Sequence, residues 1–434
     1  MTSSLRARVP DSPRPKAAIV VTGSELVRGE RTDLNGPFLA AQALELGLEP
    51  ARITIVGDRP DELEAALREG LEADLCLVSG GLGPTHDDRT VELLARAAGR
   101  ELVLDDGLHD EIGDVSRAVA ERLRRPYADF EPGVRKQATL PDGGISLGLA
   151  GTAPGIVLDT GHGAAVVLPG PPSELQRLWP RALETDPVRR VLRRAQPPGR
   201  RVIRFYGASE SAVAKALADA GGDGGGVEAT ICAREFEIHV DLLVDPGFEA
   251  RGEALERALV EPLERYLFAR DERPVEALVL DLCRTRGLTL ATAESCTGGL
   301  VGARLTSVPG SSDVFVGGVV AYANRVKEAE LGVAAGTLAE HGSVSAETAA
   351  EMASGVRARL GADVGIAVTG IAGPGGGTPE KPVGLVYLHA ETPDGGHGLE
   401  FSFPSDRETI RARATVAALH LARRLLSQDR DIRV

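Results

Sequence analysis

Apolar and polar positions along the first part of the chain predict strands and helices in turn. AAIVVTG (17–23), ARITIVG (51–57) and DLCLVSGG (74–81) are continuous apolar runs typical of buried strands. NGPFLAAQALELG and PDELEAALREGLE, between them, have the spacing of helices. Alternation at this interval predicts a parallel or mixed sheet with helices on its faces. Two more apolar runs within 151–175 complete this sheet and predict a first domain over 17–180.

The pattern changes after residue 180. An arginine-rich run (188–204), a helical segment, a glycine cluster and the alternating EFEIHVDLLVD predict a small α+β unit over 181–272. From residue 274 helices and strands alternate again, which predicts an α/β sandwich over 274–430. The fold class is therefore α/β, in three parts.

Composition and charge narrow the classes of function. The net charge of −14 repels polyanions, and only the run 188–204, with seven arginines and no acid, could contact nucleic acid. A solvated helix end followed by a strand explains that run equally well. Four scattered cysteines form no metal or disulfide pattern, and no segment has the apolar length of a signal peptide or membrane span. We expect a cytoplasmic protein with reduced thiols and without a membrane or nucleic-acid partner.

The segment TLATAESCTGG (289–299) places two candidate nucleophiles, Ser295 and Cys296, where a strand turns into a helix. A nucleophile there lies at the positive end of the helix dipole, beside backbone N–H groups that are free to bind an oxyanion. A glycine-rich turn that binds a phosphate without covalent chemistry has the same pattern. Cys296 would need a histidine to hold its thiolate, and it can equally be a small buried apolar residue.

Two further loops could complete a site around Ser295. Lys327, in VVAYANRVKEAELG, follows a strand end, and a desolvated lysine can serve as the base of a serine. Most single lysines are solvated surface residues. Thr369 and Gly370 open the loop VTGIAGPGGGTPEKPVG (368–384), which is either a rigid ligand-enclosing surface or a long exposed turn.

Several motifs together resemble one protein family, that of the competence/damage-inducible protein A (CinA). The last unit resembles the C-terminal domain of this family through AESCTGG, GGVVAYANRVKEAELGV, GSVSAETAAEMASGVR, VTGIAGPGGG and KPVGLVYL. The first domain resembles the same family through TGSELVRGERTDLN, QALELGLEP, SGGLGPTHDD, GTAPG and LPGPPSEL. The resemblance covers residues 17 to 428. It implies that the last unit is a nicotinamide-nucleotide amidase, which hydrolyses nicotinamide mononucleotide to nicotinate mononucleotide and ammonia without a cofactor.

The resemblance also assigns roles to single residues. It implies that Ser295 is the nucleophile and Lys327 its general base. An arginine of DRETIRA, Arg411 or else Arg407, is implied in the site, where its planar fork suits the 5′-phosphate. The other residues implied in substrate binding are Cys296, Thr297, Gly298, Tyr322, Asn324, Thr369 and Gly370.

The first domain resembles the molybdopterin-binding fold, and in this family it is associated with metal-dependent ADP-ribose pyrophosphatase activity. Glycine N–H groups of GGLGPTHDD can cradle a pyrophosphate, while Asp87 and Asp88 offer hard oxygen ligands for Mg²⁺ or a similar divalent metal. Alternatively, both aspartates cap the following helix. Leu34 stands where the family has a hydroxyl residue. The remaining residues of this expected site are Glu25, Asp33, Asn35, Gly80, Gly81, Gly83 and Thr85.

Two other functions stay open. One is a pterin- or nucleotide-binding accessory protein of competence or DNA recombination without amidase activity. The other is the adenylylation or transfer of molybdopterin by the first domain. The middle unit resembles the KH-like segment of the family, but its glycine cluster GGDGGG argues against nucleic-acid binding. The expected partners are nucleotide substrates and, because helix-flanked sheets often self-associate, a second copy in a homodimer.

Overall fold

The computed structural model describes residues 14–402 and 404–427. The chain divides into two compact units, Met1–Gly199 with Asp245–Glu249, and Arg200–Val244 with Ala250–Val434. The opening residues 1–13 and the expected domain end at residue 430 lie outside the described residues. The expected middle unit and the last sandwich share the second compact unit, and the boundaries expected at 180 and 272 stay predictions.

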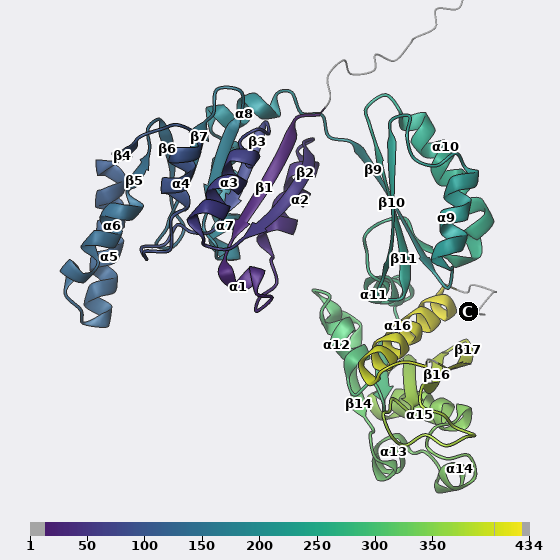
Figure 1. Cartoon of the computed structure of the whole chain (residues 1–434). Helices are drawn as coiled ribbons and strands as arrows, with labels where there is room; N and C mark the ends of the chain where they lie inside the picture. Colours follow the sequence, from purple (N-terminus) through teal and green to yellow (C-terminus); the bar gives the residue numbers. More distant parts are fainter. Residues whose placement is uncertain (1–13, 403, 428–434) are drawn as a thin grey trace, which may run out of the picture. The chain divides into compact units, whose positions relative to one another are not determined.

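Six strands form the sheet of the first unit, in the order β2-β1-β3-β8-β7-β6 (Figure 1). They are β1 (Lys16–Thr22), β2 (Glu49–Val56), β3 (Leu75–Ser79), β6 (Gly144–Leu149), β7 (Pro154–Asp159) and β8 (Ala164–Leu168). The strands β2, β1, β3 and β8 are parallel, whereas β7 pairs antiparallel with β8 on one side and with β6 on the other. Residues 160–163 are too few for the crossover that a parallel β7–β8 pair would need. The expected parallel or mixed sheet is confirmed.

Alternate residues of β1 point to opposite faces of this sheet, and helices cover both faces. Ile19 and Val21 pack with α2, α7 and α8, whereas Val20 packs with α3, α4 and α5. The short strands β4 and β5 and the helices α5 and α6 lie at one end of the unit (Figure 1), and the apolar pattern did not predict them. The elements are α1 (Ser24–Val27), α2 (Asn35–Glu45), α3 (Pro60–Gly70), α4 (Thr90–Ala97), β4 (Leu102–Leu104), α5 (Asp106–Leu123), η1 (Tyr127–Asp129), α6 (Glu131–Gln137), β5 (Thr139–Pro141), α7 (Pro172–Leu183) and α8 (Asp186–Leu192).

The second unit begins with a four-stranded sheet in the order β10-β11-β9-β12. Its elements are β9 (Gly199–Tyr206), α9 (Glu210–Asp219), β10 (Val227–Arg234), β11 (Glu237–Val244), α10 (Glu249–Val260), η2 (Glu261–Tyr266) and β12 (Leu267–Ala269). The strands β10 and β11 form an antiparallel hairpin, and Val240, Leu242 and Val244 of β11 are buried as their alternation predicted. The small α+β fold expected here is confirmed.

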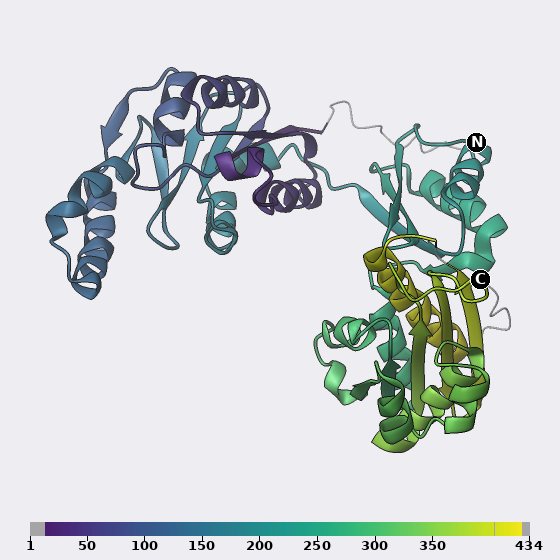
Figure 2. The same ribbon diagram turned by 60° about the horizontal axis from the view of Figure 1, so that its bottom comes forward.

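A five-stranded sheet in the order β14-β13-β15-β16-β17 forms the rest of the second unit (Figure 2). Its strands are β13 (Leu290–Glu294), β14 (Phe315–Val320), β15 (Val364–Gly370), β16 (Leu385–Thr392) and β17 (Gly395–Ser402). Both neighbours of β13 run parallel to it, so the loops after β13, β14 and β15 leave the same edge of the sheet. The three loops expected to form one site therefore start side by side.

Helices cover both faces of the last sheet, which confirms the expected sandwich. The helices α11, α12 and α16 contribute to one core, and α13 and α15 to the other. The apolar pattern did not predict α13 and α14, because each has at most eight residues. The helices are α11 (Val275–Arg286), α12 (Leu300–Thr306), α13 (Asn324–Leu331), α14 (Ala335–Glu340), α15 (Ala346–Leu360) and α16 (Arg407–Leu426), with the short η3 (Ser311–Asp313).

The arginine-rich run 188–204 lies on α8 and β9, where carboxylates neutralise most of its charge. Arg190 pairs with Asp159 in the first unit, and Arg204 pairs with Asp241 in the second. Arg194, Arg200 and Arg201 also form ion pairs with acidic side chains. Over the part of the chain that the structure describes, no helix is long and apolar enough to cross a membrane.

Candidate active site

Ser295 directly follows β13, at the edge of the sheet where the loops leave. Its N–H donates to the carbonyl of Val368 on β15 over 2.9 Å, so the strand pairing fixes the backbone of the serine. Gly298 and Gly299 then turn the chain into α12 with φ values of 62° and 101°. Side chains other than glycine rarely adopt this left-handed conformation. The two glycines of the motif are therefore required by the turn.

Lys327 reaches Ser295 from the first turns of α13. Its Nζ lies 3.1 Å from Ser295 Oγ and donates to the carbonyl of Ala321 over 2.7 Å. Only 1% of this lysine is exposed, and burial lowers its pKa below the ordinary value. Desolvation disfavours the charged amine, so a neutral amine with a lone pair toward the serine hydroxyl becomes accessible. The structure thus brings together the expected nucleophile and the expected base.

Cys296 lies next to the serine and is buried like it, but the amine of Lys327 contacts the serine hydroxyl. It is 5% exposed, and burial raises the pKa of its thiol to about 11, although backbone N–H groups, Lys327 and Arg411 act in the opposite direction. A thiol with this pKa is protonated at neutral pH and is a poor nucleophile. The protonated thiol, together with the contact of 3.1 Å between Lys327 Nζ and Ser295 Oγ, therefore favours Ser295 over Cys296.

The expectation that the N–H groups at the start of α12 are free is wrong for three of them. Glu294, the last residue of β13, accepts hydrogen bonds from the N–H groups of Gly299, Val301 and Gly302 over 2.9, 3.1 and 2.9 Å. The sequence did not reveal this role, because a glutamate at a strand end has no preferred direction. The N–H groups of Cys296 and Thr297, which lie beside the Cys296 thiol, are left as the candidate oxyanion donors.

The two candidate arginines, Arg407 and Arg411, have different roles. Arg411 donates to the carbonyls of Cys296 and Thr297 over 3.1 and 2.9 Å, and so it supports the serine loop. Arg407 is exposed and donates to the carbonyl of Gly373 over 2.7 Å and to the hydroxyl of Tyr322 over 3.1 Å. Of the two, Arg407 is the one that can turn toward a substrate without releasing the loop that carries the nucleophile.

The other expected pocket residues divide into anchors and exposed positions. Thr369 is buried, and its hydroxyl donates to the carbonyl of Ser343 over 2.6 Å. A Cβ at Gly370 would lie 2.8 Å from the carbonyl oxygen of Leu385. Thr369 and Gly370 therefore fix the backbone at the end of β15. Tyr322 is 61% exposed, and Asn324 is exposed at the start of α13. The hydroxyl of Thr297 is buried, and within the described part of the chain it has no hydrogen-bond partner.

The loops expected to form the N-terminal site also meet. Asn35, the first residue of α2, donates through its side-chain amide to Ser79 Oγ over 2.8 Å and to the carbonyl of Gly170 over 2.7 Å. This amide connects the loops that follow β1, β3 and β8. Asp33 accepts from the N–H groups of Asn35 and Gly36, and its carboxylate therefore stabilises the first turn of α2.

The loop that follows β1 is held by an aspartate that the sequence analysis did not identify. Asp58 accepts from the Thr22 hydroxyl over 3.1 Å and from the Ser24 hydroxyl over 2.6 Å. The carboxylate of Glu25 folds back toward Gly23, where an added Cβ would lie 3.0 Å from its oxygens. No motif contains Asp58, and only its position after β2 brings it to this loop.

Removing the Asn35 amide should destabilise the first unit. Asn35→Ala leaves the buried Ser79 hydroxyl and the Gly170 carbonyl without this partner, and we expect a loss of about 2 kcal/mol in the free energy of unfolding. The measurement is urea unfolding followed by the fluorescence of Trp179, the single tryptophan, which lies in the core of the first unit. Asn324→Ala, at an exposed position of the second unit, is the control. An unchanged midpoint for Asn35→Ala would contradict this role of the amide.

The glycine-containing loop after β3 packs tightly against neighbouring side chains and backbone. A Cβ at Gly81 would lie 2.1 Å from Thr90 Oγ1, and one at Gly83 would lie 2.3 Å from Asp88 Oδ2. Gly80 has a φ of 106°, and there a Cβ would lie 2.5 Å from the carbonyl of Thr22. These glycines allow the backbone to approach its neighbours closely.

The alternative in which Asp87 and Asp88 cap α4 is wrong. The residue before this helix is Arg89, and it has no side-chain capping bond. Instead Asp88 accepts from the N–H of Thr85 over 3.0 Å, and the single hydroxyl hydrogen of Thr85 is shared between Asp87 and Asp88. Both carboxylates therefore belong to the loop that precedes the helix.

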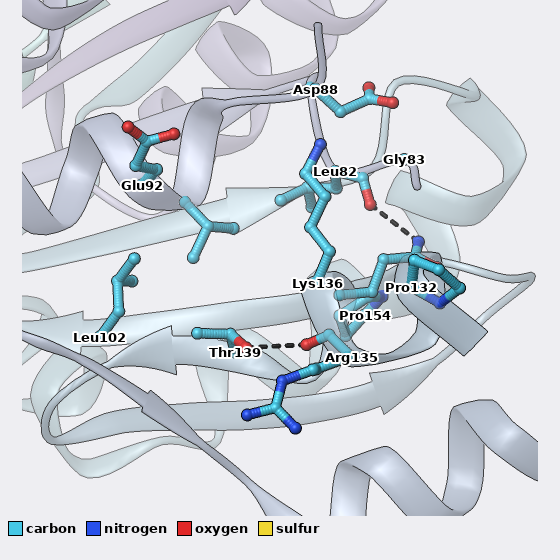
Figure 3. A pocket seen from close by; sticks show the side chains of 13 residues that line it. Leu82, Gly83, Asp88, Glu92, Leu102, Pro132, Arg135, Lys136, Thr139 and Pro154 are labelled. Carbon is cyan, nitrogen blue, oxygen red and sulfur yellow. Dashed lines mark hydrogen bonds between the residues drawn. The ribbon is translucent and has the colours of Figure 1, made fainter. Parts of the chain in front are cut away.

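A pocket of about 380 Å³ opens beside this loop (Figure 3). Lys136 of α6 lies in it with Asp88 and Glu92, and burial lowers the pKa of this lysine, opposed by Asp88 and Asp87. Lys136 also donates to the carbonyl of Thr85. Sequence reasoning missed Lys136, because it lies about fifty positions after the loop and in no recognised motif.

Asp87 and Asp88 do not form a complete metal site by themselves. Among the described residues, no group of three or more His, Cys, Asp or Glu side chains is placed to hold a metal. Mg²⁺ commonly takes one or two carboxylates and completes its shell with water and substrate phosphates. Asp87 and Asp88 fit such a cation only together with a bound phosphate.

Two family models match this chain, one in each compact unit. The family model "CinA C-terminal domain" matches residues 272–426, and "Probable molybdopterin binding domain" matches residues 18–187. The CinA-like protein of Mycolicibacterium gilvum is 44% identical over 425 residues, which cover 95% of this chain and 99% of the relative. The CinA-like protein of Mycobacterium tuberculosis is 43% identical over 422 residues, with 95% and 97% covered.

Solved structures give matches to parts of the chain. The competence/damage inducible protein CihA from Agrobacterium tumefaciens is 41% identical, with 36% of this chain and 96% of that chain covered and a TM-score of 0.33. The protein CinA from Thermoplasma acidophilum is 32% identical, with 40% and 99% covered and a TM-score of 0.35. The relatives that match over nearly their whole length decide the family. This chain belongs to the CinA family.

Proposed function

We propose that the second unit hydrolyses the carboxamide of nicotinamide mononucleotide to nicotinate mononucleotide and ammonia. The observation that carries this proposal is the buried contact of 3.1 Å between Lys327 Nζ and Ser295 Oγ. A nucleophile paired with a desolvated base is the arrangement that acyl transfer requires. The identity of the substrate comes from the family resemblance, and the pyridinium ring makes its carboxamide a better acyl donor because it withdraws electrons.

The residues suggest the order of the steps. Neutral Lys327 donates one N–H to the carbonyl of Ala321 and takes the proton of Ser295 as Oγ attacks the carboxamide carbon. The N–H groups of Cys296 and Thr297 stabilise the oxyanion. The lysine then protonates the nitrogen of the substrate, the C–N bond breaks and ammonia leaves. Water, deprotonated by the same amine, then attacks the acyl-serine, the ester C–O bond breaks, nicotinate mononucleotide leaves and the lysine returns the proton to Ser295 Oγ.

Arg407 is our candidate for the 5′-phosphate. It is exposed, and it lies beside the hydroxyl of Tyr322, so a planar guanidinium and a phenol could contact the same phosphate. Arg411 is less suited to this role, because both of its described bonds go to carbonyls of the serine loop.

A second activity, hydrolysis of the pyrophosphate of ADP-ribose, is favoured by one observation in the first unit. The pocket beside the loop that contains Gly81 and Gly83 places the ammonium group of Lys136 near Asp88. An ammonium and backbone N–H groups could bind a pyrophosphate, and a divalent cation held by Asp87 and Asp88 would supply further charge neutralisation.

The test of the main proposal is product formation by the full chain. Wild-type protein should release ammonia and nicotinate mononucleotide in equal amounts from nicotinamide mononucleotide, and nicotinamide riboside, which lacks the phosphate, should show a raised KM. Absence of both products would overturn the amidase. In a parallel assay, AMP released from ADP-ribose in the presence of Mg²⁺ would support the second activity, and no AMP would remove it.

A further inference from the structure

The turn of the β10–β11 hairpin has an unfavourable backbone. Its two residues, Glu235 and Phe236, both have positive φ values, 50° and 69°. Two-residue turns of this kind favour Asn-Gly or Gly-Gly, because residues with bulky side chains rarely adopt the left-handed conformation. Such conformations persist only where surrounding contacts determine them. The turn therefore needs contacts beyond the hairpin.

The two turn residues and the residue after them each contact a helix behind the serine loop. Glu235 forms an ion pair of 2.8 Å with Arg304 of α12. The ring of Phe236 lies 4.7 Å from the guanidinium carbon of Arg413 on α16. The carboxylate of Glu237, at the start of β11, lies 2.7 Å from Nε2 of His420, also on α16. We call residues 235–237 the hairpin tip.

Both helices contacted by the hairpin tip hold the serine loop. The first turn of α12 donates three N–H groups to Glu294, the residue before Ser295. From α16, Arg411 holds the carbonyls of Cys296 and Thr297. The hairpin tip thus contacts the same two helices, α12 and α16, that support the loop of the nucleophile.

The outer contacts of the hairpin tip are not part of a packed core. A cavity of about 530 Å³ is lined by Glu235, Phe236 and residues of α12 and α16. Phe236 remains 38% exposed, whereas His420 is fully buried. Glu235 and Phe236 can therefore be changed without opening the core, and Arg304 keeps a second partner, Glu276, at 2.8 Å.

We propose that the hairpin tip is a positioning clamp for the serine loop, acting through α12 and α16. Glu235 and Phe236 are positioning residues, since neither touches Ser295 or Lys327. This inference rests on the proposed function only where it concerns catalysis. The placement of the loop itself can be measured without any activity.

Cys296 provides the readout, because it lies in the serine loop and is buried. In a Cys232→Ala background, which removes the exposed cysteine, the rate at which a maleimide labels Cys296 reports opening of the loop. Cys283, buried in the same unit, reports general unfolding. Mass spectrometry of the labelled peptides separates the two rates in the full chain.

Two double variants separate the clamp from the stability of the hairpin. Glu235→Gln with Phe236→Leu removes the charge and the ring. Glu235→Asn with Phe236→Gly removes the same contacts but gives the turn the residues that it favours. Glu228→Gln, at an exposed position of β10, is the matched control.

We expect both double variants to label Cys296 at least about fivefold faster than the control, with the labelling of Cys283 unchanged. If the chain is an amidase, kcat should also fall below that of the control, because the serine loop carries the nucleophile. Labelling of Cys296 at the control rate in the Asn-Gly variant would overturn the clamp. If the wild-type protein has no amidase activity but the double variants still label Cys296 faster, the clamp is retained and the proposed function is overturned.

Discussion

Ser295→Ala should abolish the hydrolysis of nicotinamide mononucleotide, with kcat lowered by a factor on the order of 10⁴ or more. Removing the hydroxyl removes the atom that forms the acyl intermediate, and Lys327 is left without a proton to accept. The substitution changes one buried oxygen and leaves the backbone bond from residue 295 to Val368 in place, so the fold should persist. The measurement is the rate of ammonia release under saturating substrate.

The neighbouring cysteine supplies the control for this result. Cys296→Ala should keep kcat within about threefold of the wild type, because the buried thiol, with a pKa raised to about 11, is protonated at neutral pH. Loss of activity in Cys296→Ala together with retention in Ser295→Ala would reverse the assignment. Equal activity in all three proteins would remove the serine loop from the chemistry.

Lys327→Met should lower kcat by about 10³-fold. Methionine has a similar length and fits a buried position, but it cannot accept the proton of Ser295. Lys327→Arg should be equally inactive, because a guanidinium remains charged and offers no lone pair. Lys215→Met, at an exposed position of α9, is the matched control and should retain full activity. An active Lys327→Met would show that another group is the base.

The pH profile tests the same lysine in the wild type. Burial lowers the pKa of Lys327, and the neutral amine that acts as base is the form present above that pKa. The value of kcat should therefore rise with pH and level off at a pH below that at which an ordinary lysine titrates. A profile that falls with rising pH over this range, or one that Lys327→Met leaves unchanged, would contradict the assignment.

Most strands and long helices of this chain could be predicted from local pattern, and several site residues could not. Continuous apolar runs such as 74–81 reveal a buried strand, because burial on both faces leaves no polar position. The short elements β4, β5, α13 and α14 escaped, because a periodic pattern needs more residues than they contain. Asp58 and Lys136 were missed for another reason, because each reaches its site from a distant part of the chain.

By itself the sequence determined the α/β class, the strand end that carries Ser295, and the three loops that leave one sheet edge. These follow from the order of apolar runs and from the placement of glycines, both of which are local properties. The tertiary structure decided which side chains meet. It favoured Ser295 over Cys296 through the contact of Lys327 with the serine hydroxyl, and it separated Arg407 from Arg411 through their hydrogen bonds.

Glu294 shows most clearly why the contacts between side chains are known only from the tertiary structure. Its sequence position is compatible with an exposed strand end, with a base or with a metal ligand. Packing directs its carboxylate to the N–H groups of Gly299, Val301 and Gly302, so three of the N–H groups that the sequence led us to expect as oxyanion donors are already bonded. The direction of a side chain depends on the residues that surround it in space, and local sequence does not contain them.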